Sequence, residues 1–346
     1  MIAKAALASG AALLALIGVE LVLQLYVRVI ADDRNLLRSR TAVQAEASWT
    51  VYDKDLGWGN RPGVQLIDHF PTEPGDVRIN AQGLRADRDF TPQPPEGRRR
   101  VLALGDSFTF GFDVGNGLDW PTRIEALEPQ LEVLNLGVCA YGLDQIVLAY
   151  ERAAARFEHD FVVLGFLNWD VNRATNDFTA SGYSRPLFRV RRGRLALTNV
   201  PVPPPRPPGS ARFGSLMLAR YWRTMLVNRE VHRFIDRPAT SQSWKLGRLL
   251  LRRLKASAEA AGARLAVVDI PWFGHLETID RPMLKFVPRL FTEEGIDYMD
   301  LHPLFRERIA HEQLYITPQG GHCSPAGYAL IAAQALELIR RVPVQP

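Results

Sequence analysis

The sequence predicts an α/β fold, a doubly wound parallel sheet. Three observations predict it: five short apolar runs recur beyond residue 98, helical stretches separate most of them, and the composition is 47% hydrophobic and 23% charged. Buried parallel strands appear as short continuous apolar runs, because helices cover both faces of their sheet. The composition is ordinary for a globular protein and excludes a disordered chain, a collagen and a coiled coil.

Strands and helices are expected to alternate along the chain. The runs that predict strands are 100–104, 132–136, 161–167, 264–270 and 297–301, and helices are expected at 119–128, 143–157, 244–261 and about 325–340. The third and fourth runs lie much farther apart in the sequence than the other neighbouring runs do. Segment 175–243 is therefore interpreted as an insertion that follows the third strand.

The insertion is basic. Residues 175–245 carry 13 Lys and Arg against 3 Asp and Glu, and they include the stiff proline-rich piece 201–209 and an amphipathic stretch at 214–235. The whole chain has a net charge of only +5, which argues against a dedicated nucleic-acid-binding protein. Ligands of doubly wound sheets bind at the carboxyl ends of the strands. We therefore expect a lid or a binding surface, whose charge either contacts an anion or is simply solvated.

The N-terminus predicts a membrane anchor. From Ala5 to Val27 the chain is almost entirely apolar, apart from Glu20 and Gln24. At about 1.5 Å per residue this stretch spans roughly 35 Å, which is enough to cross a bilayer core. A cleaved signal peptide has a shorter apolar region, so we favour an uncleaved transmembrane helix within residues 1–30. The flanking basic residues leave its orientation open.

Chemistry-bearing residues follow several of the predicted strands. Ser107 comes directly after the first strand, at a strand-to-helix turn where its Oγ is accessible and a helix N-terminus can stabilise negative charge. The alternative is that Ser107 is only a helix N-cap. Asn168 follows the third strand, and His322 lies just before the last predicted helix. A serine nucleophile needs a base and oxyanion donors, and the topology brings such groups to this one edge.

These blocks together resemble the SGNH/GDSL hydrolase superfamily. The resemblance is carried by Gly105-Asp106-Ser107, by Asn168, and by His322 with Ser324 and Gly327, and it covers about residues 50–340. The upstream stretches 55–58 and 78–85 resemble segments that precede the hydrolase domain in membrane-anchored bacterial members. The resemblance implies a flavodoxin-like five-stranded sheet, Ser107 as the nucleophile and His322 as the general base, with no metal or organic cofactor.

The resemblance also implies the oxyanion donors, and the chain departs from the family near three of its blocks. The donors would be the backbone N–H groups of Ser107 and Ala140 and the side chain of Asn168. Ala140 takes the place of the family's second-block glycine, with Gly137 nearby, and Trp169 separates Asn168 from Asp170. The family's acid lies three residues before the histidine, where this chain has Gln319. An amide there leaves a Ser–His dyad, a triad with another acid such as Asp300, or an inactive site.

Two cysteines lie next to these blocks, Cys139 in the second-block loop and Cys323 after His322. Two cysteines exclude a disulfide-rich scaffold and a cysteine-based zinc site. They are either small buried residues or, if the domain is extracytoplasmic, a disulfide between the two loops.

The leading hypothesis is a single-pass membrane protein with an extracytoplasmic serine esterase domain. The expected organisation is an anchor at 1–30, a connecting region at 31–97 and a hydrolase domain at 98–341. The esterase would remove acyl groups from a glycan or a lipid. An O-acyltransferase working beside a multispan membrane protein uses the same acyl-enzyme, and the sequence does not separate the two. The third hypothesis is a non-catalytic binding protein on this fold, and Gln319 is its main support.

Overall fold

The structure is a computed structural model that describes residues 15–20, 22, 49–70, 75–175, 183–205, 229–276, 281–317 and 320–341. Its centre is a five-stranded sheet in the order β11-β10-β7-β5-β6, and every pairing in it is parallel. The strands are β5 (Arg99–Leu104), β6 (Leu131–Asn135), β7 (Phe161–Phe166), β10 (Arg264–Asp269) and β11 (Asp297–Asp300). Each overlaps a predicted run, and β5 and β6 begin one residue earlier than predicted. In chain order the arrangement is 2-1-3-4-5, which confirms the flavodoxin-like sheet.

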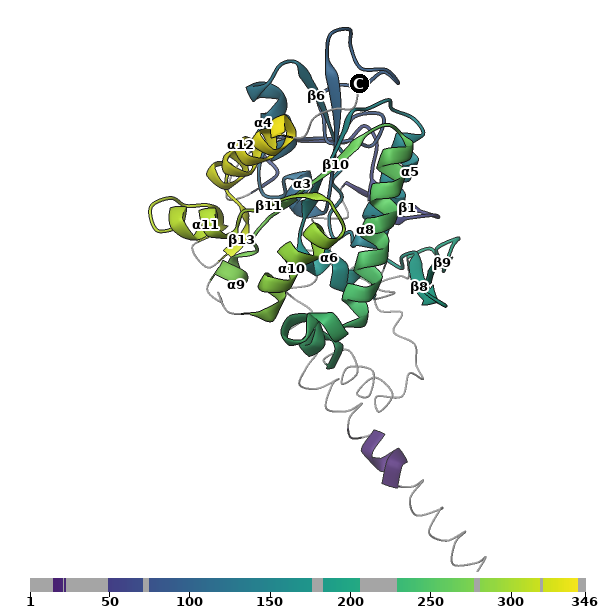
Figure 1. Cartoon of the computed structure of the whole chain (residues 1–346). Coiled ribbons are helices and arrows are strands. Elements are labelled where there is room, and N and C mark those ends of the chain that lie inside the picture. The colour runs from purple at the N-terminus through teal and green to yellow at the C-terminus, as the bar shows by residue number, and fades with distance from the viewer. Residues whose placement is uncertain are drawn as a thin grey trace, which may run out of the picture.

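Helices cover both faces of this sheet (Figure 1). One face carries α5 (Leu143–Ala154), α8 (Gln242–Ala260) and α10 (Pro282–Glu293), and the other carries α4 (Trp120–Leu127) and α12 (Pro325–Arg341). Successive side chains of a strand point to opposite faces, so Leu102 and Leu104 pack with the first group while Val101 and Ala103 pack with the second. Helix α10 is not predicted from the sequence, because Pro288 inside it disguises the helical pattern.

Shorter elements complete the described part of the chain. They are α3 (Ser107–Phe110), α6 (Asn168–Arg173), α9 (Phe273–Leu276), α11 (His302–Arg308), the 3₁₀ turn Pro238–Thr240, helical residues 229–236, and four antiparallel strand pairs. The pairs are β1 (Thr50–Asp53) with β2 (Gly57–Asn60), β3 (Gln65–Leu66) with β4 (Val77–Arg78), β8 (Leu187–Arg191) with β9 (Arg194–Thr198), and β12 (Tyr315–Thr317) with β13 (Gly320–Cys323).

The predicted membrane span at 5–27 lies mostly outside the described residues. Only 15–20 and 22 belong to them, and they are helical. Across the ranges that the structure describes, no helix combines the length and apolar character needed to cross a bilayer.

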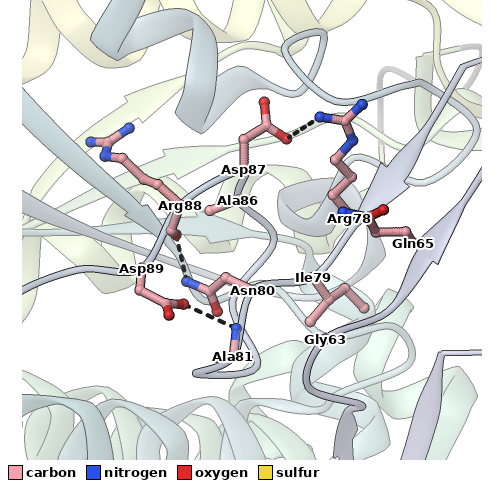
Figure 2. A pocket seen from close by; sticks show the side chains of 10 residues that line it. All are labelled: Gly63, Gln65, Arg78, Ile79, Asn80, Ala81, Ala86, Asp87, Arg88 and Asp89. Carbon is pink, nitrogen blue, oxygen red and sulfur yellow. Dashed lines mark hydrogen bonds and ion pairs between the residues drawn. The ribbon is translucent and has the colours of Figure 1, made fainter.

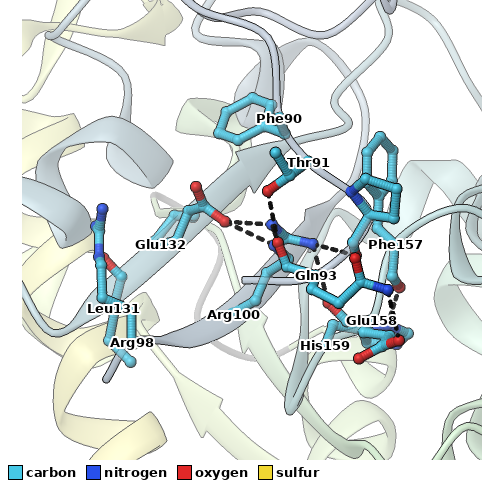
Figure 3. Close-up of polar contacts among 12 residues, drawn as sticks. Phe90, Thr91, Gln93, Arg98, Arg100, Leu131, Glu132, Phe157, Glu158 and His159 are labelled. Atoms are coloured by element: carbon cyan, nitrogen blue, oxygen red, sulfur yellow. Dashed lines mark hydrogen bonds and ion pairs between the residues drawn. The ribbon is translucent and has the colours of Figure 1, made fainter. Parts of the chain in front are cut away.

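A buried ion pair ties the upstream segment to the amino edge of the sheet (Figure 3). Arg100 on β5 is fully buried, and its Nε donates to Glu132 Oε2 on β6 at 2.7 Å. The same guanidinium donates to the carbonyls of Pro92, Gln93 and Glu158. A buried arginine is stable only when its donors are satisfied, so this cluster fixes the chain that enters β5.

The described part of the predicted connecting region, 49–70 and 75–97, packs against the loop after β5. Trp49 stacks on Phe110 with ring centroids 5.8 Å apart, and both belong to a small apolar cluster with Cys139. Hydrogen bonds fold the turn at 78–89: Asn80 Nδ2 donates to the carbonyl of Arg88, and the Ala81 N–H donates to Asp89 (Figure 2). This region therefore supports the edge of the sheet where Ser107 lies.

Candidate active site

Ser107 is the first residue of α3, on a tight turn that leaves β5. Gly105 has φ +153°, and a Cβ there would lie 2.1 Å from Thr109 Oγ1, so only glycine fits this turn. Asp106 is the N-cap, and its Oδ1 accepts from the Phe108 N–H at 2.9 Å. Ser107 is thus not the capping residue, and its hydroxyl is available for another role.

His322 on β13 contacts that hydroxyl. Its Nε2 lies 2.9 Å from Ser107 Oγ, and its Nδ1 lies 3.0 Å from Asp113 Oδ2. The imidazole ring lies near the rings of Phe108 and Phe112, with centroids 4.9 and 4.6 Å away. With Nδ1–H donating to the carboxylate, Nε2 is free to accept the serine proton. The three side chains are therefore connected in the order carboxylate, imidazole and hydroxyl, which is the arrangement that activates a serine.

The acid of this arrangement is Asp113, which the sequence analysis did not identify. It lies in the loop after α3 with φ +71°, a left-handed conformation that aspartate tolerates better than most residues. Asp300 does not contact His322, because its carboxylate lies 2.8 Å from His302 Nδ1. Gln319 lies outside the described residues. No spacing rule points to Asp113, and the only available signal was an aspartate in the loop next to the nucleophile turn.

The loop that carries Asp113 is held by two buried side chains. Arg85 is completely buried and donates to the carbonyls of Phe110, Gly111 and Val114. Tyr328 on α12 donates to the Phe112 carbonyl at 3.1 Å. Carbonyls on both sides of Asp113 therefore accept hydrogen bonds from buried side chains. Removing either side chain would leave buried carbonyl oxygens without a hydrogen bond, which costs free energy. Burial lowers the pKa of Arg85 from its usual value.

Two of the predicted oxyanion donors are backbone N–H groups, and the third is the side chain of Asn168. The N–H groups of Ser107 and Ala140 have no acceptor among the described residues, and Ala140 has φ +63°, which explains why glycine suits this position. Gly137 is not a donor to the site, because its N–H already donates to Asn135 Oδ1 at 2.9 Å. A Cβ on Gly137 would lie 2.2 Å from the Phe110 nitrogen, so this glycine allows close packing against α3.

Asn168 begins α6 directly after β7, and it is 2% exposed. Strands β5 and β7 are neighbours in the sheet, and the order of strands reverses between them. That reversal is where doubly wound sheets bind their ligands. The topology therefore brings Asn168 to the edge that Ser107 occupies, as the sequence predicts.

A charged cluster lies behind the nucleophile turn. Arg173 Nη1 contacts Asp106 Oδ2 at 2.7 Å and Asp170 Oδ1 at 2.5 Å. Burial and the neighbouring Asp106 carboxylate raise the pKa of Asp170 well above its usual value, against the attraction of Arg173. Asp106 caps α3 through Oδ1 and binds Arg173 through Oδ2, so the cluster ties the nucleophile turn to α6.

A cavity of about 370 Å³ opens on the Ser107 hydroxyl. It is lined by Ser107, Phe108, Leu167, Trp169, Arg173, Trp272, Gly321 and His322. Trp169 and Trp272 meet edge to face at its wall, with centroids 6.3 Å apart. The walls are thus mostly apolar, with one guanidinium. A second cavity of about 260 Å³, beside Asn80, has polar walls without a histidine or a serine (Figure 2).

The side chains around Asp300 form a separate buried cluster. Asp269, Asp300 and His302 bring ligand-type atoms within 4.8 Å of one another, and Tyr298 donates to Asp269 Oδ2 at 2.7 Å. Burial raises the pKa of Asp269 to about 6. Burial alone would lower the pKa of His302, but Asp269 and Asp300 raise it above its usual value. Asp300 Oδ1 lies 2.8 Å from His302 Nδ1, while Asp269 Oδ1 and His302 Nε2 have no hydrogen-bond partner among the described residues.

The two cysteines do not form the disulfide that the sequence analysis considered. Cys139 packs in the cluster around Trp49, whereas Cys323 is buried with Tyr315 and Tyr328. They belong to different parts of the core.

Comparison with solved structures finds GDSL-type lipolytic proteins and esterases, matched over about 70% of the chain. A member of the lipolytic G-D-S-L family from Veillonella parvula has 13% identity and a TM-score of 0.42, covering 70% of this chain and 99% of that one. An esterase from Pseudoalteromonas sp. has 11% identity and a TM-score of 0.40, with 70% and 97% coverage. An acetylxylan esterase from Geobacillus stearothermophilus has 15% identity and a TM-score of 0.39, with 70% and 94% coverage.

No protein-family model matches the sequence, and no curated protein matches it either. Likenesses as distant as those to the solved structures assign neither an activity nor a substrate to this chain. The chemistry is therefore argued from the contacts among Ser107, His322 and Asp113 alone.

Proposed function

We propose that this chain is a serine esterase of the SGNH/GDSL type that works through an acyl-enzyme on Ser107. One observation carries the proposal: His322 lies 2.9 Å from Ser107 Oγ on one side and 3.0 Å from Asp113 on the other. This contact joins residues more than 200 positions apart in the sequence, and it opens into the 370 Å³ cavity. A non-catalytic binding protein has no need of such an arrangement.

The proposed reaction has two steps. An ester carbonyl enters the cavity, Ser107 Oγ attacks its carbon, and His322 Nε2 takes the serine proton while Asp113 stabilises the imidazolium. The Ser107 and Ala140 N–H groups and the Asn168 amide are the proposed oxyanion donors, each worth about 10²–10³ in rate. The alcohol leaves with the proton from His322. Water then attacks the acyl-enzyme, with the same residues acting in reverse.

The proposed substrate is an acylated glycan or lipid with a small acyl group. A cavity of this volume with apolar walls suits a short acyl chain, and Arg173 offers a donor to an oxygen nearby. The apolar N-terminal segment supports a further part of the proposal, a membrane-anchored enzyme with an extracytoplasmic catalytic domain. A multispan membrane protein as acyl donor belongs to the acyltransferase alternative.

The test is labelling of the detergent-solubilised full chain with a fluorophosphonate probe. We expect the wild type to be labelled, and the labelling to be lost in both S107A and H322A, because the probe reacts with an activated serine only. The other serines of the chain provide an internal control, since they remain present in S107A. A wild type that stays unlabelled while folded would overturn the proposal in favour of a binding protein.

Hydrolysis and transfer are then separated with an acetyl ester whose acyl group is isotopically labelled. Release of free acetate in water supports the esterase. An acyl-enzyme that persists in water but is discharged by a sugar hydroxyl would replace it with the acyltransferase.

A further inference from the structure

The hairpin formed by β8 and β9 is a basic surface that the proposed reaction does not use. It projects from the body of the molecule beside α8 (Figure 1). Its base is fixed, because Phe188 is buried beneath the guanidinium of Arg253 and the Val202 N–H donates to the Lys54 carbonyl. The outer part is exposed.

The strand register divides the hairpin into two faces. Phe188 lies opposite Leu197, and Val190 lies opposite Leu195, so these four apolar side chains share one face. The other face carries Arg189, Arg191 and Arg194, with Arg191 directly opposite Arg194. Arg192 is in the turn, with φ +50°. The hairpin is thus amphipathic, with arginine on one side and aliphatic residues on the other.

These arginines are not neutralised within the described part of the protein. Residues 183–205 contain five arginines and no acidic residue. Among the described residues, no ion pair or hydrogen bond involves the side chains of Arg189, Arg191, Arg192 or Arg194. Like charges placed directly opposite in a two-stranded ribbon destabilise it. The fold therefore retains a repulsion that a bound anion would remove.

We infer that the β8–β9 hairpin binds the anionic phospholipid headgroups of a bilayer. The arginines would contact the phosphates, and the exposed Val190 and Leu197 would enter the interface, while Phe188 and Leu195 of the same face pack against the core. An anionic glycan explains the arginines equally well, but it does not explain the exposed aliphatic side chains of the opposite face: Val190 is 46% exposed and Leu197 42%. A face of this composition matches the boundary between headgroups and acyl chains.

The hairpin is connected to the rim of the catalytic cavity. Arg185, just before β8, donates from Nη1 to the Arg173 carbonyl at 2.8 Å and pairs with Asp144, and Arg173 lines the cavity. A hairpin seated on the bilayer therefore fixes the orientation of the cavity relative to the membrane. This inference is independent of the proposed esterase activity, because no step of it involves Ser107.

The test places a fluorescent probe on the hairpin of the full chain reconstituted in vesicles. V190C is labelled with an environment-sensitive dye, and the native Cys139 and Cys323 are buried and do not compete for it. We expect a blue shift in vesicles of phosphatidylcholine with about 30% phosphatidylglycerol and a much smaller one in phosphatidylcholine alone, since anionic lipid attracts basic segments. The shift is expected to be lost at high salt.

Two matched controls sharpen the result. The triple variant R189Q/R191Q/R194Q loses the shift, whereas R308Q/R340Q/R341Q, with the same change in net charge at arginines that are ion-paired elsewhere, keeps it. A probe at L127C, which is 55% exposed at the end of α4, stays in water. The hairpin triple variant also melts at an equal or higher temperature than the wild type, because it loses the repulsion between Arg191 and Arg194.

Three results would overturn the inference. They are no shift in anionic vesicles, an equal shift in phosphatidylcholine alone that survives the hairpin triple variant, and a shift produced by soluble polygalacturonate but not by vesicles. The last would make the hairpin a site for an anionic glycan. If the triple variant does not fold, the blue shift is measured in R194Q alone, where we expect it to be smaller than in the wild type.

Discussion

Two acid–histidine pairs lie at the carboxyl side of the sheet, and only one has the features of a catalytic pair. His322 Nδ1 is 3.0 Å from Asp113, and His302 Nδ1 is 2.8 Å from Asp300. The difference is on the other nitrogen. His322 Nε2 contacts the Ser107 hydroxyl, whereas His302 Nε2 is buried without a partner among the described residues.

Exposure separates the two pairs as well. The side chain of His322 is 24% exposed and borders the cavity, whereas that of His302 is 3% exposed. A short acid–histidine contact is therefore not by itself a sign of catalysis. A nucleophile on the second nitrogen and access for a substrate make the difference. The His302 imidazole instead lies at the end of β10 and β11, between Asp269 and Asp300, whose carboxylates raise its pKa against the effect of burial.

The largest expected effect comes from removing each histidine in turn. H322Q should lower kcat by about 10⁴-fold or more with little change in melting temperature, because it removes the general base. H302Q should leave the kcat of the folded protein within about threefold of the wild type and lower its melting temperature, because Asp269 and Asp300 lose the imidazole that contacts both of them. Ester hydrolysis and thermal unfolding of both variants measure this. Equal losses of activity would erase the distinction between the pairs.

A smaller effect is expected from loosening the loop that carries Asp113. R85M leaves the carbonyls of Phe110, Gly111 and Val114 without their donor. We expect a loss of about 2–4 kcal/mol in the free energy of unfolding and a lower kcat in the protein that still folds, with KM less affected.

The matched control is R88M, because Arg88 pairs with Glu125 at a half-exposed position. It should cost less than about 1 kcal/mol. A kcat for R85M that equals the wild-type value would show that the loop holds its geometry without Arg85.

The smallest effect is a dependence of stability on pH. The raised pKa of His302 contributes stability that is complete below its unfolded pKa near 6.5 and is lost as pH rises through the folded pKa. Asp269, with its pKa raised to about 6, contributes in the same direction, and its part is lost as pH rises from about 4 to 6.

The wild type should therefore lose about 1–2 kcal/mol of unfolding free energy between pH 5 and 8 from this cluster, and D269N/H302Q should show a flatter profile. Urea unfolding at a series of pH values measures this. A stability profile that rises with pH in the wild type alone would contradict the assignment of the buried pair.

The sequence predicted the scaffold well, because its signals are local. The five strands are continuous apolar runs, and Ser107 and His322 are recognisable from short motifs next to predicted elements. Their convergence followed from the topology of a parallel sheet. The role of Gly137 was harder to predict, because only the structure shows that a Cβ at this position would collide with the Phe110 nitrogen.

Asp113 and Arg85 could not be predicted for a different reason. The role of Asp113 depends on a left-handed loop whose shape is fixed by a side chain from a distant part of the chain. Such contacts leave no periodic pattern in a single sequence. Asp300 is adjacent to a strand end and was therefore the natural candidate, but its neighbour His302 already occupies its carboxylate.

The most direct test of the central claim compares D113N with D300N in their rate of reaction with a fluorophosphonate. We expect D113N to react at least about 10²-fold more slowly than the wild type, because an amide cannot stabilise the imidazolium and favours the wrong tautomer. D300N should react within about threefold of the wild-type rate, since its partner His302 does not contact Ser107. A slow D300N beside an unaffected D113N would contradict the assignment of Asp113 as the acid of the site.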